Sequence, residues 1–323
     1  LPIYTSEKID GPWKKQLIEG FYHDGSLLFD EDGRNYIVYG NDEIWITELN
    51  EDLTAPKKDG LHRLLVSDHK NPELGYEGSH IQKINGYYYI FLVHSLRDRW
   101  MRTEACFYSD SLEGEFTGGD VLCDDRGYCG QGVAQGGIVD TPDGKWYAML
   151  FQDSGAVGRI PILLPVTWKD HFPFFGQNGH VPEEIEVHST RPGYIYQPLV
   201  GSDDFCNGLL PRWQFNHDPD PRYYHLDALQ GTYTITTREV CTELTQAVNT
   251  LTQRMSYPSC AAEVTVDASA LKEGDVAGLC ALQSCYAAVG ITKHHGKYEV
   301  LMLDKKEDGI LDMTEGTVVE SHQ

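Results

Sequence analysis

The chain has 323 residues, which is enough for two domains that each bury a core of their own. Its formal net charge of −23 argues against binding to nucleic acid or to an anionic membrane, because both partners require a basic patch. No apolar run reaches the ~18 residues of a membrane span, and residues 1–20 lack the basic-then-apolar pattern of a signal peptide. We therefore predict a soluble protein without a membrane partner, and both a cytoplasmic and a secreted location stay open.

A short pattern occurs three times in the first half of the chain. Each copy begins with polar residues and continues into a β segment. It then turns through Gly together with Asn or Asp, and returns in a segment rich in aromatic and β-branched residues. One more apolar segment closes each copy. The copies cover residues 23–49, 77–108 and 133–168.

The polar residues that we align at the starts of these copies are Asp24, Glu77 and Gln135, which lie 53 and 58 residues apart. Hairpins that recur about every 50 residues are typical of a β-propeller, with roughly four strands in each blade. Since the first strand of each blade lines the central channel, the three residues should converge on one axial site. The spacing thus predicts both a fold and the position of its functional site.

We expect residues 1–195 to form the β-propeller and residues 202–323 to form a second domain. The segment from about residue 182 to 201 is punctuated by prolines and should connect the two. The alternation and even turns of the segments that follow predict an antiparallel β-sandwich, so the whole chain should be all-β. These β segments are residues 231–237, 261–266, 277–282, 286–292 and 298–304.

The cysteines contain no C-x-x-C pair, and at this chain length they do not indicate a disulfide framework. We expect all eight to be buried free thiols. They are Cys106, Cys123, Cys129, Cys206, Cys241, Cys260, Cys280 and Cys285.

Asp24 and Glu77 are the main candidates for chemistry. Two carboxylates that flank a glycosidic bond can hydrolyse it, since one donates a proton to the leaving oxygen while the other activates water or attacks. Such an acid keeps its proton near neutral pH through burial or a neighbouring carboxylate. The alternative is that both are surface turn residues, as most Asp and Glu residues are. We interpret the acidic residues of the distal turns as turn formers: Asp30, Glu31, Asp32, Asp140 and Asp143.

Arg159 opens an otherwise apolar β segment, where a cation can hold a carboxylate or a sugar hydroxyl; a solvent-facing arginine is an equal alternative. No serine has the context of a nucleophile elbow, and Walker and dinucleotide fingerprints are absent from the sequence. The other candidates for substrate binding are Trp45, Ser79, His80 and Gln135. Further aromatic residues that can stack on a sugar, although most should be core, are Tyr76, Trp100 and Trp146.

The repeated units contain four distinctive segments: HDGSLLFDEDGRNYIVYG, YEGSHIQKINGYYYIFLVHS, GQGVAQGGIVDTPDGKWYAMLFQD and GRIPILLPVTW. Together they resemble glycoside hydrolase family 43. The tail, from SDDF through LTQRMSYPSCAAEVTVD, is similar to the β-sandwich of that family's xylosidase/arabinofuranosidase branch. The resemblance implies a five-bladed β-propeller followed by a jelly-roll, lectin-like sandwich, with inverting β-xylosidase or α-L-arabinofuranosidase activity.

The resemblance also implies roles for individual residues. Glu77 would be the general acid, Asp24 the carboxylate that tunes the pKa of the acid, and Arg159 the arginine that contacts Asp24 and the sugar. The family's general base is an Asp in the first blade, so we expect that base and the N-terminal blades to lie outside this chain, and the sandwich to be truncated. No cofactor is required. Many relatives hold an axial calcium through a His at the position of Gln135, and a Gln amide oxygen can also ligate calcium.

The sequence therefore predicts an exo-acting hydrolase that removes xylose or L-arabinofuranose from plant cell-wall oligosaccharides such as those of xylan. Its partner would be a xylo- or arabino-oligosaccharide substrate. Whether the chain forms a homo-oligomer is left open by the sequence. A carbohydrate-binding propeller without catalysis is the alternative, because the general base is not found in the chain. A fructan-type hydrolase shares the architecture but needs a nucleophile motif that the chain does not show.

Overall fold

The computed structural model describes residues 1–187, 189, 191–256, 259–283, 285–305 and 317–322. Its contacts divide the chain into two units, Leu1–Ser189 and Thr190–Gln323. Within the described residues the regular structure is almost entirely β, with short 3-10 turns at Gly155–Val157 and Leu244–Gln246. In that part of the chain, no helix has the length and apolar character needed to cross a membrane.

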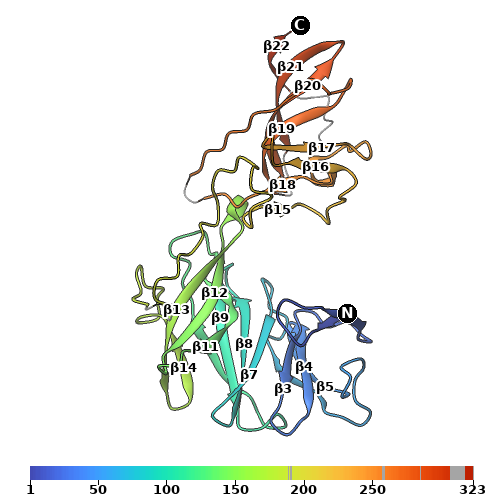
Figure 1. Ribbon diagram of the computed structural model, residues 1–323. Coiled ribbons are helices and arrows are strands. Elements are labelled where there is room, and N and C mark those ends of the chain that lie inside the picture. The colour runs from blue at the N-terminus through green and yellow to red at the C-terminus, as the bar shows by residue number, and fades with distance from the viewer. Residues whose placement is uncertain (188, 190, 257–258, 284, 306–316, 323) are drawn as a thin grey trace. The chain divides into compact units, whose positions relative to one another are not determined.

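The first unit contains three four-stranded antiparallel sheets, and in each sheet the strands lie side by side in chain order (Figure 1). The first sheet consists of β3 (Ser26–Phe29), β4 (Asn35–Asn41), β5 (Glu43–Leu49) and β6 (His62–Ser67). The second consists of β7 (Glu77–Ile84), β8 (Tyr87–Ser95), β9 (Arg102–Ser109) and β10 (Thr117–Leu122). The third consists of β11 (Ala134–Asp140), β12 (Trp146–Asp153), β13 (Arg159–Lys169) and β14 (Phe172–Phe175). The repeated hairpins predicted from the sequence are thus propeller-type blades.

Side chains of alternate residues in β8 enter two different cores, because successive residues of a strand face opposite sides of a sheet. Tyr88, Ile90 and Leu92 pack against the first sheet. Tyr89 and Phe91 pack against the third sheet. The second sheet is therefore buried on both faces, which explains why β8 has an uninterrupted run of apolar and aromatic residues.

A two-stranded ribbon, β1 (Pro2–Thr5) and β2 (Lys14–Leu17), precedes the first sheet. Ile3 and Ile18 of this segment pack with Ile37 on the opposite face of the first sheet from the second. The first sheet is thus also covered on both faces.

Asp30 was predicted to be a simple turn former, and the structure shows that it does more. Its side chain is only 1% exposed and accepts hydrogen bonds from Lys83 Nζ at 2.6 Å and from Tyr88 Oη at 2.5 Å. Burial acts to raise the pKa of Asp30, but the bonds from Lys83 and Tyr88 outweigh it and lower the pKa. The turn at the end of β3 thus connects the first sheet to the second.

The second unit contains one four-stranded antiparallel sheet of β19 (Val276–Leu282), β20 (Tyr286–His294), β21 (Lys297–Lys305) and β22 (Thr317–His322). The unit also contains two separate two-stranded sheets: β15 (Gln214–Phe215) with β18 (Leu251–Thr252), and β16 (Tyr224–Asp227) with β17 (Thr232–Ile235). The all-β sandwich that the sequence predicts is confirmed. The strand predicted at residues 261–266 is wrong: this segment forms no ladder with the described residues, and alternation alone cannot supply a pairing partner.

The prediction that the cysteines are buried is wrong for most of them. All eight are free thiols, as expected, but Cys106 in β9 is the one that is buried. Four are exposed, and these lie in segments outside the strands, where no sheet covers them: Cys123, Cys129, Cys206 and Cys260.

Candidate active site

The inner strands of the second and third sheets begin with a common backbone distortion. The pairing of β7 with β8 shifts register between Glu77 and His80, and that of β11 with β12 shifts between Ala134 and Gly137. A bulge of this kind redirects the side chains beside it. The two bulges lie at the same end of both strands, beside the polar side chains there.

Positive φ angles show which residues are structurally equivalent. They occur at Asp24 (46°), Gly78 (64°) and Gln135 (66°), just before or at the beginning of each inner strand. The equivalent of Asp24 in the second sheet is therefore Gly78, and Glu77 precedes it by one residue, as His23 precedes Asp24. The sequence alignment of Asp24 with Glu77 was off by one residue, because spacing alone does not reveal which residue takes the positive φ.

Glu77 lies where the first and second sheets meet and is held by residues of the first. Its Oε2 accepts a hydrogen bond from Asn41 Nδ2 at 2.8 Å and lies 3.4 Å from His23 Nε2. The side chain is 22% exposed, which leaves it accessible to a ligand. Sequence reasoning missed Asn41, whose position at the end of β4, opposite the start of β3, was the available signal.

Asp24 shares its neighbours with Glu77. His23 Nε2 lies 3.6 Å from Asp24 Oδ2, which also accepts a hydrogen bond from the Gly78 backbone N–H at 3.1 Å. Ligand atoms of His23, Asp24 and Glu77 all lie within 4.8 Å of one another. The two carboxylates that the sequence singled out therefore belong to one compact group, with a histidine between them.

Ser79 lies beneath this group rather than at its surface. It is buried, and its Oγ lies 2.8 Å from the backbone oxygen of Asp24 and 3.2 Å from that of Val38. A hydroxyl has a single proton to donate, so these two carbonyls share it. Ser79 thus fixes the Asp24 turn to the second sheet.

His80 follows Ser79 in β7, and its side chain is exposed at the surface. Burial lowers the pKa of His80 below its ordinary value, and the opposing effect of Asp24 is weaker. A Cβ at Gly137 of β11 would lie 3.4 Å from His80 Nδ1, which is ordinary van der Waals contact, so this ring packs close to the start of β11.

Trp45 lies apart from these residues. Its ring stacks on His62 at a centroid distance of 5.2 Å, in the outer strands β5 and β6 of the first sheet. The structure therefore does not bring Trp45 together with the carboxylates.

Gln135 is enclosed by charged residues of β9 that the sequence analysis missed. Its backbone N–H donates to Glu104 Oε2 at 2.6 Å, and its Oε1 accepts from Arg102 Nη2 at 3.3 Å. Glu104 is fully buried, which raises its pKa well above the ordinary range. Its Oε1 has no hydrogen-bond partner among the described residues. Charged residues within the buried strand β9 were the signal that sequence reasoning overlooked.

Arg159 is connected to Arg102 and Gln135 through hydrogen bonds of Asp153. Asp153 accepts a hydrogen bond from the buried Arg102 at 2.7 Å and from Arg159 at 3.3 Å. Both guanidinium groups also contact the ring of Phe151, with centroid distances of 4.8 and 4.5 Å. The side chain of Arg159 is 63% exposed, so it can reach a ligand while Asp153 orients it.

A calcium ion at Gln135 is poorly supported by these contacts. Calcium requires six to eight oxygen ligands, whereas the amide oxygen of Gln135 already faces the guanidinium of Arg102. The positive charge of that guanidinium opposes a divalent cation at the same oxygen. These contacts disfavour a calcium ion bound directly to the Gln135 amide oxygen, and an axial calcium stays a prediction.

Residues 3–173, which include all three sheets except the last two residues of β14, match the family model for glycosyl hydrolases family 43. The chain belongs to this family. Residues 202–323 match the β-xylosidase C-terminal concanavalin A-like domain, in agreement with the sandwich of the second unit. The resemblance and the fold class predicted from the sequence are both confirmed.

Individual members of family 43 resemble nearly the whole chain. The structure of a bifunctional GH43-CE protein of Bacteroides eggerthii is 38% identical, with a TM-score of 0.81 over 99% of this chain and 41% of that one. A GH43 hydrolase engineered at its active site to display both endo-xylanase and exo-arabinofuranosidase activity is 26% identical, with a TM-score of 0.76 over 96% and 60% of the two chains. A β-xylosidase of Formosa agariphila is 25% identical over 94% of this chain and 60% of its own length. The chain thus spans less than two thirds of the length of these relatives.

Proposed function

We propose that this family 43 protein is an exo-acting, inverting glycoside hydrolase that removes xylose or L-arabinofuranose from plant cell-wall oligosaccharides. The observation that carries the proposal is the convergence of Asp24 and Glu77, from two different sheets, on one accessible group with His23. A β-xylosidase and an engineered enzyme with exo-arabinofuranosidase activity among its relatives support this substrate class.

In the proposed mechanism, Glu77 donates its proton to the glycosidic oxygen as the bond to the sugar breaks. Asn41 and His23 hold its Oε2, which leaves Oε1 to face the leaving group. Asp24, fixed by Gly78 and Ser79, positions the sugar and supplies a negative charge beside the acid. Inversion further requires a carboxylate that activates water on the opposite face of the sugar. We assign that base to no residue of this sequence.

Glu77→Gln tests the role of the acid, because the amide keeps the shape but has no acidic proton. A general acid contributes about 10²–10⁴-fold to the rate, so kcat on xylobiose or an arabino-oligosaccharide should fall by that factor. The loss should be much smaller on an aryl glycoside with an acidic phenol, since that leaving group needs little protonation. Sugar binding, measured by calorimetry, should survive.

Glu31→Gln is the matched control, because Glu31 lies in the distal turn after β3 with a side chain that is 84% exposed. This variant should keep full activity. An equal loss on both kinds of substrate in Glu77→Gln, or no loss at all, would remove Glu77 from the acid role. If the unaltered protein binds these sugars without hydrolysing them, the binding propeller is the better description. Proton NMR of the first-formed anomer decides inversion, which retention of configuration would contradict.

A further inference from the structure

The hairpin that joins β20 and β21 in the second unit presents two adjacent histidines. His294 ends β20, and His295 with Gly296 forms the turn, with φ angles of 49° and 73°. Two positive φ angles are the signature of a type I′ turn. This turn brings the two imidazole rings to the same side, with centroids 4.0 Å apart, instead of on opposite faces as in a regular strand. Both side chains are exposed and accessible from solvent.

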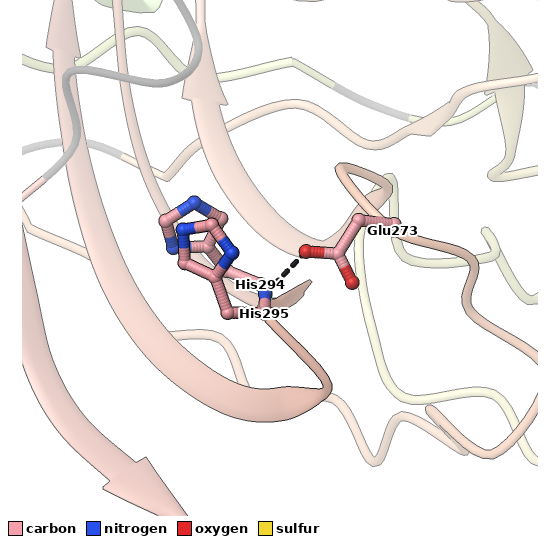
Figure 2. Close-up of side chains that lie close together, drawn as sticks. All are labelled: Glu273, His294 and His295. Carbon is pink, nitrogen blue, oxygen red and sulfur yellow. Dashed lines mark hydrogen bonds between the residues drawn. The ribbon is translucent and has the colours of Figure 1, made fainter.

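Glu273 approaches the same turn from the loop before β19, as Figure 2 shows. Its Oε1 accepts the backbone N–H of His295, and its Oε2 lies 3.3 Å from the backbone nitrogen of Gly296. The N–H of Gly274 donates to the Lys293 oxygen at 2.9 Å. The loop is therefore fixed to the hairpin by backbone hydrogen bonds, and the carboxylate does not need to be ordered by a ligand.

The backbone N–H groups of His295 and Gly296 use only part of the hydrogen-bonding capacity of the Glu273 carboxylate. A carboxylate offers about four acceptor positions, so the two backbone bonds leave lone pairs that can bind a cation.

We infer that Glu273, His294 and His295 form a binding site for a divalent transition-metal ion. One ligand atom from each residue can be chosen so that all lie within 4.8 Å of one another. Zinc takes nitrogen ligands at ~2.0–2.1 Å and carboxylate oxygens at ~2.0–2.2 Å, which places neighbouring ligands about 3.4 Å apart. Rotation of the exposed imidazole rings can close the remaining distance without a change in the backbone.

Glu299 of β21 extends the site. Its Oε2 lies 3.7 Å from His294 Nδ1, and its side chain is 19% exposed. A carboxylate at the second ring nitrogen orients an imidazole and makes it a better ligand. Lys297, opposite His294 in the hairpin, is exposed and can keep its ammonium group in solvent.

The ligand types select the metal. Imidazole suits zinc, copper and nickel, whereas calcium and magnesium prefer sites made only of oxygen. Two imidazoles and one carboxylate leave coordination positions for water, as in open zinc sites. The ion would connect the 272–275 loop to the hairpin and so stabilise the second unit, independently of the hydrolase activity proposed for the first.

The test uses the whole chain with ZnCl₂ in isothermal titration calorimetry and CuCl₂ in electron paramagnetic resonance. His294→Thr/His295→Asn removes both imidazoles but retains the hairpin, because Thr favours strands and Asn-Gly favours a type I′ turn. This variant should bind one equivalent of Zn²⁺ less than the unaltered protein. Its copper electron paramagnetic resonance spectrum should lack the splitting that two coordinated nitrogens cause. His225→Ala, which removes an exposed histidine of β16, should change neither measurement.

A second variant examines the carboxylate. Changes behind a metal ligand already weaken binding about 10–100-fold, so Glu273→Gln should weaken the Zn²⁺ equivalent at least about tenfold. The group of His23, Asp24 and Glu77 is a separate source of binding, which Glu77→Gln identifies. Unchanged Zn²⁺ stoichiometry and affinity in His294→Thr/His295→Asn, with circular dichroism unchanged, would overturn the proposal. Unchanged affinity in Glu273→Gln would overturn the three-residue site.

Discussion

The junction between the first and second sheets differs from the junction between the second and third, although both are built from the same repeated unit. At the first junction, the carboxylates Asp24 and Glu77 lie at the surface beside His23 and Asn41. At the second junction, the acidic group Glu104 is fully buried behind Gln135. Asp24 and Glu77 are thus accessible to a ligand, whereas Glu104 is enclosed and the half-exposed Asp153 beside it is paired with Arg102 and Arg159.

The neighbours of each carboxylate explain this difference. Arg102 and Asp153 form an ion pair across the second junction, and Gln135 completes it with a neutral amide. No such pair covers Asp24 and Glu77 among the described contacts, where the partners are an amide, a histidine and backbone groups. Equivalent blade positions thus acquire different chemistry from the side chains of the adjacent sheet.

Arg102→Met should produce the largest change, because it breaks the second junction. Loss of one partner of a buried ion pair costs about 3–5 kcal/mol, and we expect about 3 kcal/mol, since Asp153 is 37% exposed. Urea unfolding can be followed through tryptophan fluorescence, because five of the six tryptophans lie in the first unit. Arg159→Met removes the exposed arginine on the same Asp153 and should cost less than about 1 kcal/mol. Equal losses in the two variants would show that the buried pair has no special weight.

Tyr88→Phe weakens the first junction by a smaller amount. It removes the hydroxyl that donates to Asp30 at 2.5 Å, and hydrogen bonds to charged groups contribute about 1.5–3 kcal/mol. We expect a loss of about 2 kcal/mol in the free energy of unfolding. Because the Asp30 pKa is lowered in the folded protein, its stabilising contribution should disappear as the pH falls below the ordinary Asp range. Tyr87→Phe, at the adjacent half-buried tyrosine, is the control; a similar loss there would contradict this role for Asp30.

Ser79→Ala should have a modest effect at the first junction. A neutral hydrogen bond contributes about 1 kcal/mol, and the hydroxyl of Ser79 is shared by the backbone oxygens of Asp24 and Val38. Unfolding free energy should fall by about that amount. Hydrolysis should slow as well, because the Asp24 turn loses its support. A variant with reduced stability but unchanged kcat/KM would show that Ser79 has no influence on the position of Asp24.

Glu104→Gln tests the buried acid of the second junction, and its effect depends on pH. Burial raises the pKa of Glu104 in the folded protein, so ionisation favours the unfolded chain. The stability of the unaltered protein should therefore fall as the pH rises from the ordinary Glu pKa towards the raised value. The neutral amide removes this dependence, so the variant should gain in relative stability between pH 5 and pH 8 in urea unfolding. Parallel pH profiles for the two proteins would argue against a buried, protonated Glu104.

The sequence by itself predicted much of the fold and the two candidate carboxylates. Alternating apolar residues and Gly-containing turns are local features, and a strand with a two-residue period has few other ways to bury its apolar face. The three hairpin repeats therefore predicted three sheets, and their starts indicated Asp24, Glu77 and Gln135. The motifs also identified the family.

Only the tertiary structure decided how these residues meet. The one-residue offset between Asp24 and Glu77 depends on strand register. Arg102 and Asp153, which form an ion pair between the second and third sheets, are 51 residues apart in the sequence. The same holds for Asp30, whose partners come from the next sheet. Local patterns determine which face of a strand is buried. They do not determine which side chains of another sheet lie against it, because that depends on packing between segments distant in the sequence.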